Sequence, residues 1–440
     1  MSTPQQDVQM PAEEKPKEQK SMADNDKDSF YFSFYSNLQN QANMIGDVSR
    51  TGTYRKAILG NAAVAIKDKV VLDVGAGSGI LSYMAAQAGA KEVVALEASS
   101  MADKMQIANR GEGNPHLANK VRIVRGMVED KYVQEAVLKN GKVDTIVSEP
   151  IGVMLLHERM VESFLLARDL FLKPGGSILP SSGQIHFCPF SDEGLYNETE
   201  QKAAFFNQTL FGTDFHALFK AAREEAFAQP VVGIFPPTTL MSAPCQPTTF
   251  DFYTCAIKDL LDFSVPINFV ASRTAIMHGL ASWFDLDFDA HESTKPTDED
   301  TEADDLEQAQ WAFPVPTAGY PWLGAEQPLN PGAAPDAPRK GVKVTLSTGP
   351  NATRTHWQQA RLLLPEPLAV NRGELVVGSV RFKVNNARSY DLTLDLSVDR
   401  GVPAPDPNPL RRIATYNLQH QTFNYSYTGE TSWDATRFNA

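Results

Sequence analysis

Cysteine is the scarcest residue of chemical interest in this chain of 440 residues, which contains only Cys188, Cys245 and Cys255. Their spacing fits neither a zinc site nor a disulfide framework, so we expect small buried thiols in a reducing compartment and no bound metal. Long apolar runs are also missing, and Met1 to Asp28 lack the apolar stretch of a signal peptide. We therefore expect a cytosolic or nuclear protein without membrane association.

Positively charged residues are also fewer than negatively charged ones. The chain has 40 Lys and Arg residues against 53 Asp and Glu residues, which gives a formal net charge of -13. Such a field repels nucleic acid and anionic membranes and favours basic partners such as Arg-rich or Lys-rich peptides. Because the chain is too long for one ordinary domain and 42% hydrophobic, we expect two domains with tails.

The first 66 residues divide into two parts. Residues 1–28 are rich in Pro, Glu, Gln, Lys and Asp without periodic apolar positions, which predicts a disordered tail. From position 29 to 66, apolar residues at roughly helical spacing begin at Tyr31 and continue through Leu38, Met44 and Tyr54. This pattern predicts amphipathic helices that cover a binding site.

Residues 67–180 alternate short apolar runs with helical segments, which is typical of βαβ units and a parallel sheet. The expected helices are Ile80 to Gln87, closed by Gly89, and Met160 to Leu170. The sequence therefore predicts a doubly wound, Rossmann-like α/β domain, whose expected strands are Val70 to Val74, Val93 to Leu96, Val121 to Val124 and Val143 to Val147.

Residues 181–400 show mostly β-type alternation, interrupted twice. An aromatic-rich helical stretch covers about 195–228, and an acidic segment followed by Pro- and Gly-rich sequence covers about 289–340. We expect a second, β-rich domain with an inserted loop that is partly disordered. A solvated surface loop is one interpretation of the insertion, and a gate or attractor for basic substrates is the other. Residues 401–440 are expected to form a C-terminal tail.

A glycine-rich turn, Gly75-Ala76-Gly77-Ser78-Gly79, follows the first predicted strand and opens a helix. Glycines at this position let a ligand approach the backbone at the carboxyl edge of the sheet. Dehydrogenases use a similar turn for a pyrophosphate, but their G-x-G-x-x-G pattern needs glycine where this chain has Ile80. The compact form favours an adenosyl-amino acid, S-adenosylmethionine, over a dinucleotide.

Three charged residues accompany this turn. Glu97 ends the second predicted strand, where a carboxylate can accept both ribose hydroxyls; the alternative is a surface carboxylate. Glu129 follows the third strand and is expected near the adenine, although a structural role stays open. Arg50 is the candidate cation for the carboxylate of the donor, with a structural ion pair as its alternative.

Two glutamates, Glu149 and Glu158, bracket a Pro- and Gly-bent apolar loop after the fourth strand. Paired carboxylates repel each other, and burial raises that cost, so such a pair indicates a cation between them. A guanidinium is planar, always charged and suited to bidentate bonds with carboxylates. The pair therefore predicts an arginine side chain held beside a methyl donor, with its attacking nitrogen made more electron-rich.

Removal of a proton from the methylated nitrogen requires an acceptor. His356, next to Trp357, and Asp47 are the candidates for a histidine oriented by an acid. A lone histidine in a turn is the alternative.

Five motifs in combination resemble the type I protein arginine methyltransferases, and within them most closely the coactivator-associated (histone-arginine) group. They are Tyr31-Phe32 with Tyr35, Arg50 to Tyr54, Val71 to Gly79, Ser148 to Met160, and Thr355-His356-Trp357. The resemblance, which covers roughly Tyr31 to Val398, implies a β-barrel-like second domain with a helical dimerisation arm. It also implies asymmetric dimethylation of arginine in histones and RNA-binding or transcription-related proteins, in nucleus and cytoplasm, by a homodimer.

The resemblance further implies roles for individual residues. Glu149, Glu158, His356 and Asp47 are expected to be catalytic, and Met44, Ile151 and Trp357 to shape the substrate pocket. The donor contacts that it implies are Phe32, Tyr35, Gln41, Arg50, Gly75, Gly77, Glu97, Glu129 and Ser163.

Two positions depart from the family pattern, because Ile151 and Val153 stand where relatives usually carry methionine and an aromatic residue. The product, monomethylarginine or asymmetric dimethylarginine, is therefore open at this point. A small-molecule methyltransferase and a non-catalytic protein of the same fold are the competing hypotheses. A small-molecule enzyme has little use for two glutamates, and a non-catalytic relative is expected to have lost one of these groups.

Overall fold

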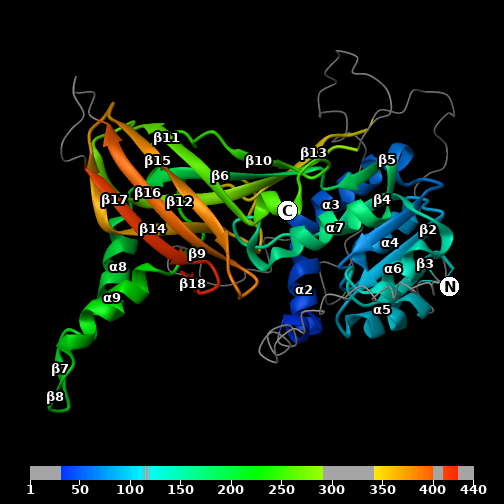
Figure 1. Ribbon diagram of the computed structural model, residues 1–440, viewed down its shortest axis with the longest axis horizontal. Coiled ribbons are helices and arrows are strands. Elements are labelled where there is room, and N and C mark those ends of the chain that lie inside the picture. Colours follow the sequence, from blue (N-terminus) through cyan, green and yellow to red (C-terminus); the bar gives the residue numbers. More distant parts are fainter. Residues whose placement is uncertain are drawn as a thin grey trace, which may run out of the picture.

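The computed structural model describes residues 31–111, 114, 117, 119–290, 341–399 and 410–424. The predicted disordered tail at 1–28 lies outside the described residues, as does nearly all of the predicted insertion at 289–340. Figure 1 shows two lobes, a parallel-sheet domain and a β-rich domain, with a helical arm that projects from the β-rich domain.

The first domain is a five-stranded parallel sheet in the order β3-β2-β1-β4-β5. The four predicted strands are confirmed, and a fifth, β5, crosses Pro174 to Gly176, where the sequence indicated only the end of a helix. The strands are β1 (Val70–Val74), β2 (Glu92–Glu97), β3 (Val121–Arg125), β4 (Val143–Ser148) and β5 (Leu172–Leu179).

Helices cover both faces of this sheet. They are α4 (Ile80–Gln87), α5 (Met101–Arg110), α6 (Lys131–Val137) and α7 (Met160–Phe171), which confirms both predicted helices. From β1 the sheet extends to one side through β2 and β3, and to the other side through β4 and β5. The strand order therefore reverses between β1 and β4. In doubly wound folds a ligand binds at the carboxyl ends of the strands beside this reversal.

The predicted N-terminal helices are present. Residues 31–35 are helical, followed by α2 (Leu38–Gly46), α3 (Val48–Gly60) and a short π-helix at Ala62–Ile66. Asp47 stands between α2 and α3, and its side chain caps α3 by accepting a hydrogen bond from the Arg50 amide. Tyr54 of α3 is fully buried against Phe288, which attaches these helices to the second domain.

The second domain consists of two antiparallel layers. A seven-stranded sheet contains the path β10-β6-β12-β14-β9-β18, with β13 paired to β12, and a four-stranded sheet has the order β11-β15-β16-β17. Figure 1 shows the two sheets wrapping around a common interior, as the predicted barrel requires. The strands of the first are β6 (Ser182–Phe190), β9 (Val231–Gly233), β10 (Thr248–Asp251), β12 (Ala275–Phe288), β13 (Val344–Ser347), β14 (Gln359–Val370) and β18 (Thr422–Phe423).

The four-stranded layer shows why these residues form strands. It consists of β11 (Asp262–Val270), β15 (Leu375–Val384), β16 (Tyr390–Asp399) and β17 (Arg411–Asn417). In β11 and β16 buried and more exposed side chains alternate, so each strand turns its apolar side to the interior. β17 continues the sheet after β16.

The predicted tail at 401–440 is therefore wrong for residues 410–424, because β17 and β18 lie there. Tyr416 of β17 is buried and donates a hydrogen bond to the Leu363 carbonyl, 2.8 Å away. The sequence between β16 and β17 is rich in proline, at 403, 405, 407 and 409, which interrupts the alternation. Proline lacks the amide hydrogen that a strand needs, so the alternation of apolar and polar residues stops before the last strands.

The helical stretch predicted at about 195–228 forms the projecting arm of Figure 1. It consists of α8 (Glu193–Ala204), a two-stranded turn, β7 (Thr209–Leu210) with β8 (Thr213–Asp214), and α9 (Phe219–Phe227). Phe205, Phe211 and Leu218 lie exposed on it. Exposed aromatic residues on one projecting element are typical of an interaction surface.

Candidate active site

A cavity of about 400 Å³ opens at the carboxyl ends of β1 to β4, beneath the N-terminal helical segments. Both domains line it, since Arg388 comes from the turn between β15 and β16. Predicted site residues that line it are Phe32, Tyr35, Gln41, Met44, Arg50, Gly75, Gly77, Glu97, Glu129, Glu149, Ile151, Glu158 and Ser163.

The glycine-rich turn forms one wall of the cavity. Gly77 and Gly79 adopt the left-handed region, with φ of 55° and 87°. A side chain at Gly79 would place its Cβ 2.8 Å from the Tyr83 ring. Only glycine fits this conformation and this space at position 79, while Gly75 and Gly77 of the same turn line the cavity.

Glu97 is fixed by the same turn. Its Oε2 accepts a hydrogen bond from the Gly77 amide at 2.8 Å, and its Oε1 accepts one from the Ser99 amide at 2.7 Å. Each carboxylate oxygen keeps a further lone pair, so Glu97 can receive two hydroxyl groups from a ligand in the cavity.

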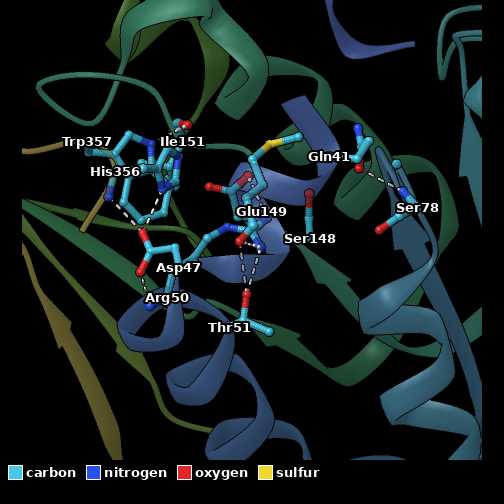
Figure 2. A network of polar contacts seen from close by, with 12 residues as sticks. Gln41, Asp47, Arg50, Thr51, Ser78, Ser148, Glu149, Ile151, His356 and Trp357 are labelled. Atoms are coloured by element: carbon cyan, nitrogen blue, oxygen red, sulfur yellow. Dashed lines mark hydrogen bonds and ion pairs between the residues drawn. The ribbon is translucent and has the colours of Figure 1, made fainter. Parts of the chain in front are cut away.

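Gln41 and Ser163 attach flanking elements to the cavity. Gln41 accepts a hydrogen bond from the Ser78 amide at 3.0 Å, which ties α2 to the glycine-rich turn (Figure 2). Ser163 of α7 donates to Glu129 at 3.0 Å. The residues predicted around the donor therefore surround one space, although they come from five separate segments.

Arg50 faces the first glutamate of the predicted pair. Its Nη2 lies 3.3 Å from Glu149 Oε2, and its Nη1 donates to the Met44 carbonyl at 3.3 Å (Figure 2). Its Nε, like Oε1 of Glu149, has no hydrogen-bond partner among the described residues. From the sequence, Arg50 is expected either to bind the carboxylate of the donor or to form a structural ion pair. Its guanidinium forms the ion pair with Glu149 and also keeps one N–H donor for an anionic ligand.

The loop from Glu149 to Glu158 turns back on itself through residues in the left-handed region. Met154, Leu155 and Glu158 have φ of 54°, 72° and 73°. Gly152 is packed so closely that a Cβ there would lie 2.2 Å from the His157 carbonyl oxygen. Such strain persists where the surrounding structure over-determines it, and it is common at functional sites. Here the turn brings both glutamates to the cavity.

Both glutamates are largely withdrawn from solvent. Burial raises the pKa of Glu149, and the positive charges of Arg50 and His356 oppose that rise. Burial likewise raises the pKa of Glu158, against hydrogen bonds from Tyr35 and Tyr31; the Tyr35 hydroxyl donates at 2.6 Å. A cation between the carboxylates would favour their ionised forms.

His356 and Asp47 are paired across the two domains, as Figure 2 shows. Asp47 Oδ2 accepts from both the ring Nδ1 and the backbone amide of His356, each at 2.7 Å. Burial acts to raise the pKa of Asp47, but hydrogen bonds from His356 and the Arg50 amide leave it below its ordinary value. Asp47 therefore stays ionised and orients the imidazole.

Trp357 fixes the loop from the other side, because its Nε1 donates to the Ile151 carbonyl at 3.2 Å. Asp47, His356 and Trp357 do not line the cavity itself. In Figure 2 they lie to one side of Glu149, together with Ile151, and Trp357 supports the loop that carries Glu149.

Arg388 and Tyr31 are among the cavity residues whose roles the sequence did not predict. Tyr31 carried a signal, since it belongs to the aromatic N-terminal motif. Arg388 carried none, because it stands in a tight turn, between β15 and β16, that only the folded chain brings to the cavity. The described helices include none long and apolar enough to cross a membrane, and the described side chains include no metal-binding cluster.

Family models match both domains. The model described as the arginine methyltransferase oligomerization subdomain matches residues 181–311 and 337–401. The model of the ribosomal protein L11 methyltransferase (PrmA) matches residues 58–183.

Curated relatives extend over most of the chain. The probable histone-arginine methyltransferase CARM1 of Oryza sativa subsp. indica is 38% identical over 390 residues, which is 88% of this chain and 63% of that protein. The histone-arginine methyltransferase CARMER of Drosophila yakuba is 39% identical over 372 residues, 84% of this chain and 59% of that protein. The chain thus spans about three fifths of the length of these relatives.

Solved structures agree with the fold. Protein arginine methyltransferase 10 of Arabidopsis thaliana matches with a TM-score of 0.68 and 25% identity, covering 88% of this chain and all of that one. The Trypanosoma brucei PRMT1 enzyme-prozyme complex with AdoHcy matches with a TM-score of 0.62 and 27% identity, covering 87% and 99%. In sequence and in its two-domain architecture, the chain is thus similar to the arginine methyltransferases.

Proposed function

We propose that this protein transfers methyl groups from S-adenosylmethionine to guanidino nitrogens of arginine residues in proteins. One observation carries the proposal: two carboxylates largely withdrawn from solvent, Glu149 and Glu158, line the same cavity as a nucleotide-type glycine turn. Support comes from the relatives, which are named histone-arginine methyltransferases, and from the Trypanosoma complex, which was solved with AdoHcy.

The residues around the glycine turn fit the donor. Glu97 is held with free lone pairs for two ribose hydroxyls, and Arg50 keeps Nε for the amino-acid carboxylate. Glu129 lies farther along the cavity, where the adenine is expected, beside Ser163. When bound, the donor supplies an electrophilic methyl group on a sulfonium. The protein residues orient it and exclude water.

The two glutamates fit the substrate. A guanidinium between them satisfies Oε1 of Glu149, which is buried and lacks a hydrogen-bond partner among the described residues. Bidentate bonds from two carboxylates draw the positive charge toward two nitrogens and leave density on the third. The Tyr35 hydroxyl, bonded to Glu158, holds that carboxylate in place.

The His356–Asp47 pair is proposed to receive the proton that the methylated nitrogen loses. His356 is one-third exposed at its side chain, so it can pass the proton to solvent, while Asp47 is almost fully covered. His356 lies close enough to Glu149 for the imidazole and the glutamate to be electrostatically coupled.

Product and partners follow from the resemblance. We propose asymmetric dimethylation, with Met44 shaping the pocket beside Ile151, on histones and RNA-binding or transcription-related proteins, in nucleus and cytoplasm. We also propose a homodimer, in which the exposed apolar residues of the arm dock on a second copy. The relatives support histones as substrates through their names.

Mass spectrometry tests the proposal. The protein and S-adenosylmethionine are incubated with arginine peptides in Pro-rich and Gly-rich contexts, and with matched peptides in which lysine replaces arginine. Added methyl groups on arginine alone, with asymmetric dimethylarginine identified by fragmentation, are expected. Symmetric or only monomethylated product would contradict the proposed product, and the absence of product on every peptide would contradict the activity.

A further inference from the structure

Arg388 lies at the cavity, and the proposed reaction does not use it. Its guanidinium carbon lies 4.8 Å from the centre of the Tyr31 ring and 5.8 Å from that of Phe32. At these distances the electron-rich faces of aromatic rings attract a cation. The second domain therefore contacts the first helical segment of the described chain, residues 31–35.

The turn that carries Arg388 is also fixed to the double-glutamate loop. Ser389 Oγ lies 2.9 Å from His157 Nδ1, and Ser389 is fully buried. Burial lowers the pKa of His157 to about 4, so this histidine is neutral near pH 7 and shares one hydrogen bond with the serine. Arg388 itself has a positive φ of 53°, which sets the direction of the turn. The guanidinium is thus placed by contacts on both sides.

The charge of Arg388 also acts on the glutamate pair. The positive charge of Arg388 acts on Glu158, whereas Arg50 contacts Glu149. Each glutamate of the pair therefore has a guanidinium of the same chain, one from α3 and one from the second domain. Buried carboxylates need such compensation when no substrate is bound. The other groups facing Glu158 are the hydroxyls of Tyr31 and Tyr35 and the carboxylate of Glu149.

We propose that Arg388 is a positioning and specificity-determining residue: it clasps segment 31–35 over the cavity, and its fixed charge beside Glu158 disfavours substrates with lysine or arginine next to the target arginine. The specificity part rests on the proposed function. The clasp does not, because Tyr31, Phe32 and Tyr35 line the cavity whatever the acceptor is.

Two consequences can be measured separately. A loosened segment 31–35 uncovers the donor region and releases the Tyr35–Glu158 hydrogen bond, so donor binding weakens without any turnover. Removing the charge of Arg388 leaves the negative charge of Glu158 uncompensated. A cation next to the target arginine of the peptide is then no longer repelled.

The clasp is tested by calorimetric titration with S-adenosylhomocysteine, which binds without reacting. Arg388→Gln is expected to weaken binding about tenfold, since a partly buried cation–π contact with two aromatic rings is lost. Arg388→Lys keeps a cation and should weaken it less. Arg411→Gln, which breaks an exposed ion pair with Asp395 elsewhere in the domain, is the control and should change nothing. Wild-type affinity in Arg388→Gln would overturn the clasp.

Specificity is tested with pairs of arginine peptides that differ only by lysine or glutamine beside the target. Wild type is expected to prefer the glutamine peptide by about threefold in kcat/KM, a preference that weakens with salt. Arg388→Gln should remove it and Arg388→Lys retain it. An unchanged ratio in Arg388→Gln would overturn the specificity part. Failure of every enzyme on every peptide would contradict the proposed function instead, while the calorimetry still decides the clasp.

Discussion

The two domains contribute to the cavity in different ways. The parallel-sheet domain supplies Glu97, Glu129 and Glu149 from consecutive strand ends, at one edge of one sheet. The β-rich domain supplies Arg388 to the cavity and His356 to the pair with Asp47 outside its lining, from separate loops that reach the site only through the domain interface. In the first domain topology alone collects the functional groups, whereas in the second domain long-range packing places them. Substitutions can measure how far the reaction depends on each.

The largest effect is expected in the first domain, from Glu158→Gln. The change removes charge compensation for the guanidinium but keeps the shape, so kcat/KM should fall about a thousandfold. Affinity for S-adenosylhomocysteine should change little, as calorimetry would show. Glu193→Gln, at the base of the arm, is the matched control. Near-normal turnover in Glu158→Gln would remove the basis for the carboxylate clamp.

The next effect crosses the domain interface. His356→Ala should lower kcat about a hundredfold, the usual contribution of a positioned proton acceptor. Asp47→Asn keeps the helix cap but loses the charge, and it should cost nearly as much. Because the two residues act as one unit, the double variant should resemble the single ones in steady-state kinetics. Additive losses would show that the two residues act independently and would contradict the pair as one unit.

The pH dependence of kcat/KM distinguishes the two glutamates from Asp47. Burial raises the pKa of Glu149 and Glu158 above 4.5, so both become protonated as the pH falls through those raised values. Asp47 has a pKa below 3.8 and stays ionised in the same window. As the pH is lowered, kcat/KM should therefore begin to fall while the pH is still above 4.5. The fall should be about tenfold per pH unit for one group. A flat profile down to pH 4.5 would argue against anionic glutamates.

A further prediction concerns the arm, where the second domain acts outside the cavity. Replacing the exposed Phe205 and Phe211 by serine should raise the dimer dissociation constant at least about tenfold, because buried aromatic residues dominate interface energies. Sedimentation equilibrium measures this constant. Val270→Ser, an exposed apolar residue on β11, is the control. An unchanged constant would place the interface elsewhere.

The smallest effect is expected from Trp357→Phe, which removes the hydrogen bond to the Ile151 carbonyl and little else. One such bond contributes about 1 kcal/mol, so kcat/KM should fall only about fivefold. A loss as large as that of His356→Ala would mean that the second domain shapes the glutamate loop far more than this single contact indicates.

Sequence and structure agree best where function is encoded locally. The glycine turn, Glu97 and the glutamate loop follow strands with clear patterns, so their shared edge could be predicted from parallel topology alone. Chemistry made His356 and Asp47 candidates, but their pairing gained its main support from the resemblance, because 309 positions separate the two residues. Arg388 and β17 were missed for physical reasons: a tight turn has no periodicity, and prolines interrupt the alternation before the last strands.

The central claim is that Glu149 and Glu158 recognise the charge of a guanidinium. The most direct measurement is calorimetry with a peptide that carries arginine and with the same peptide carrying citrulline, a neutral isostere, both in the presence of S-adenosylhomocysteine. The structure predicts that wild type binds the arginine peptide at least about tenfold more tightly and that Glu158→Gln loses most of this preference. Equal affinity of wild type for both peptides would contradict the claim.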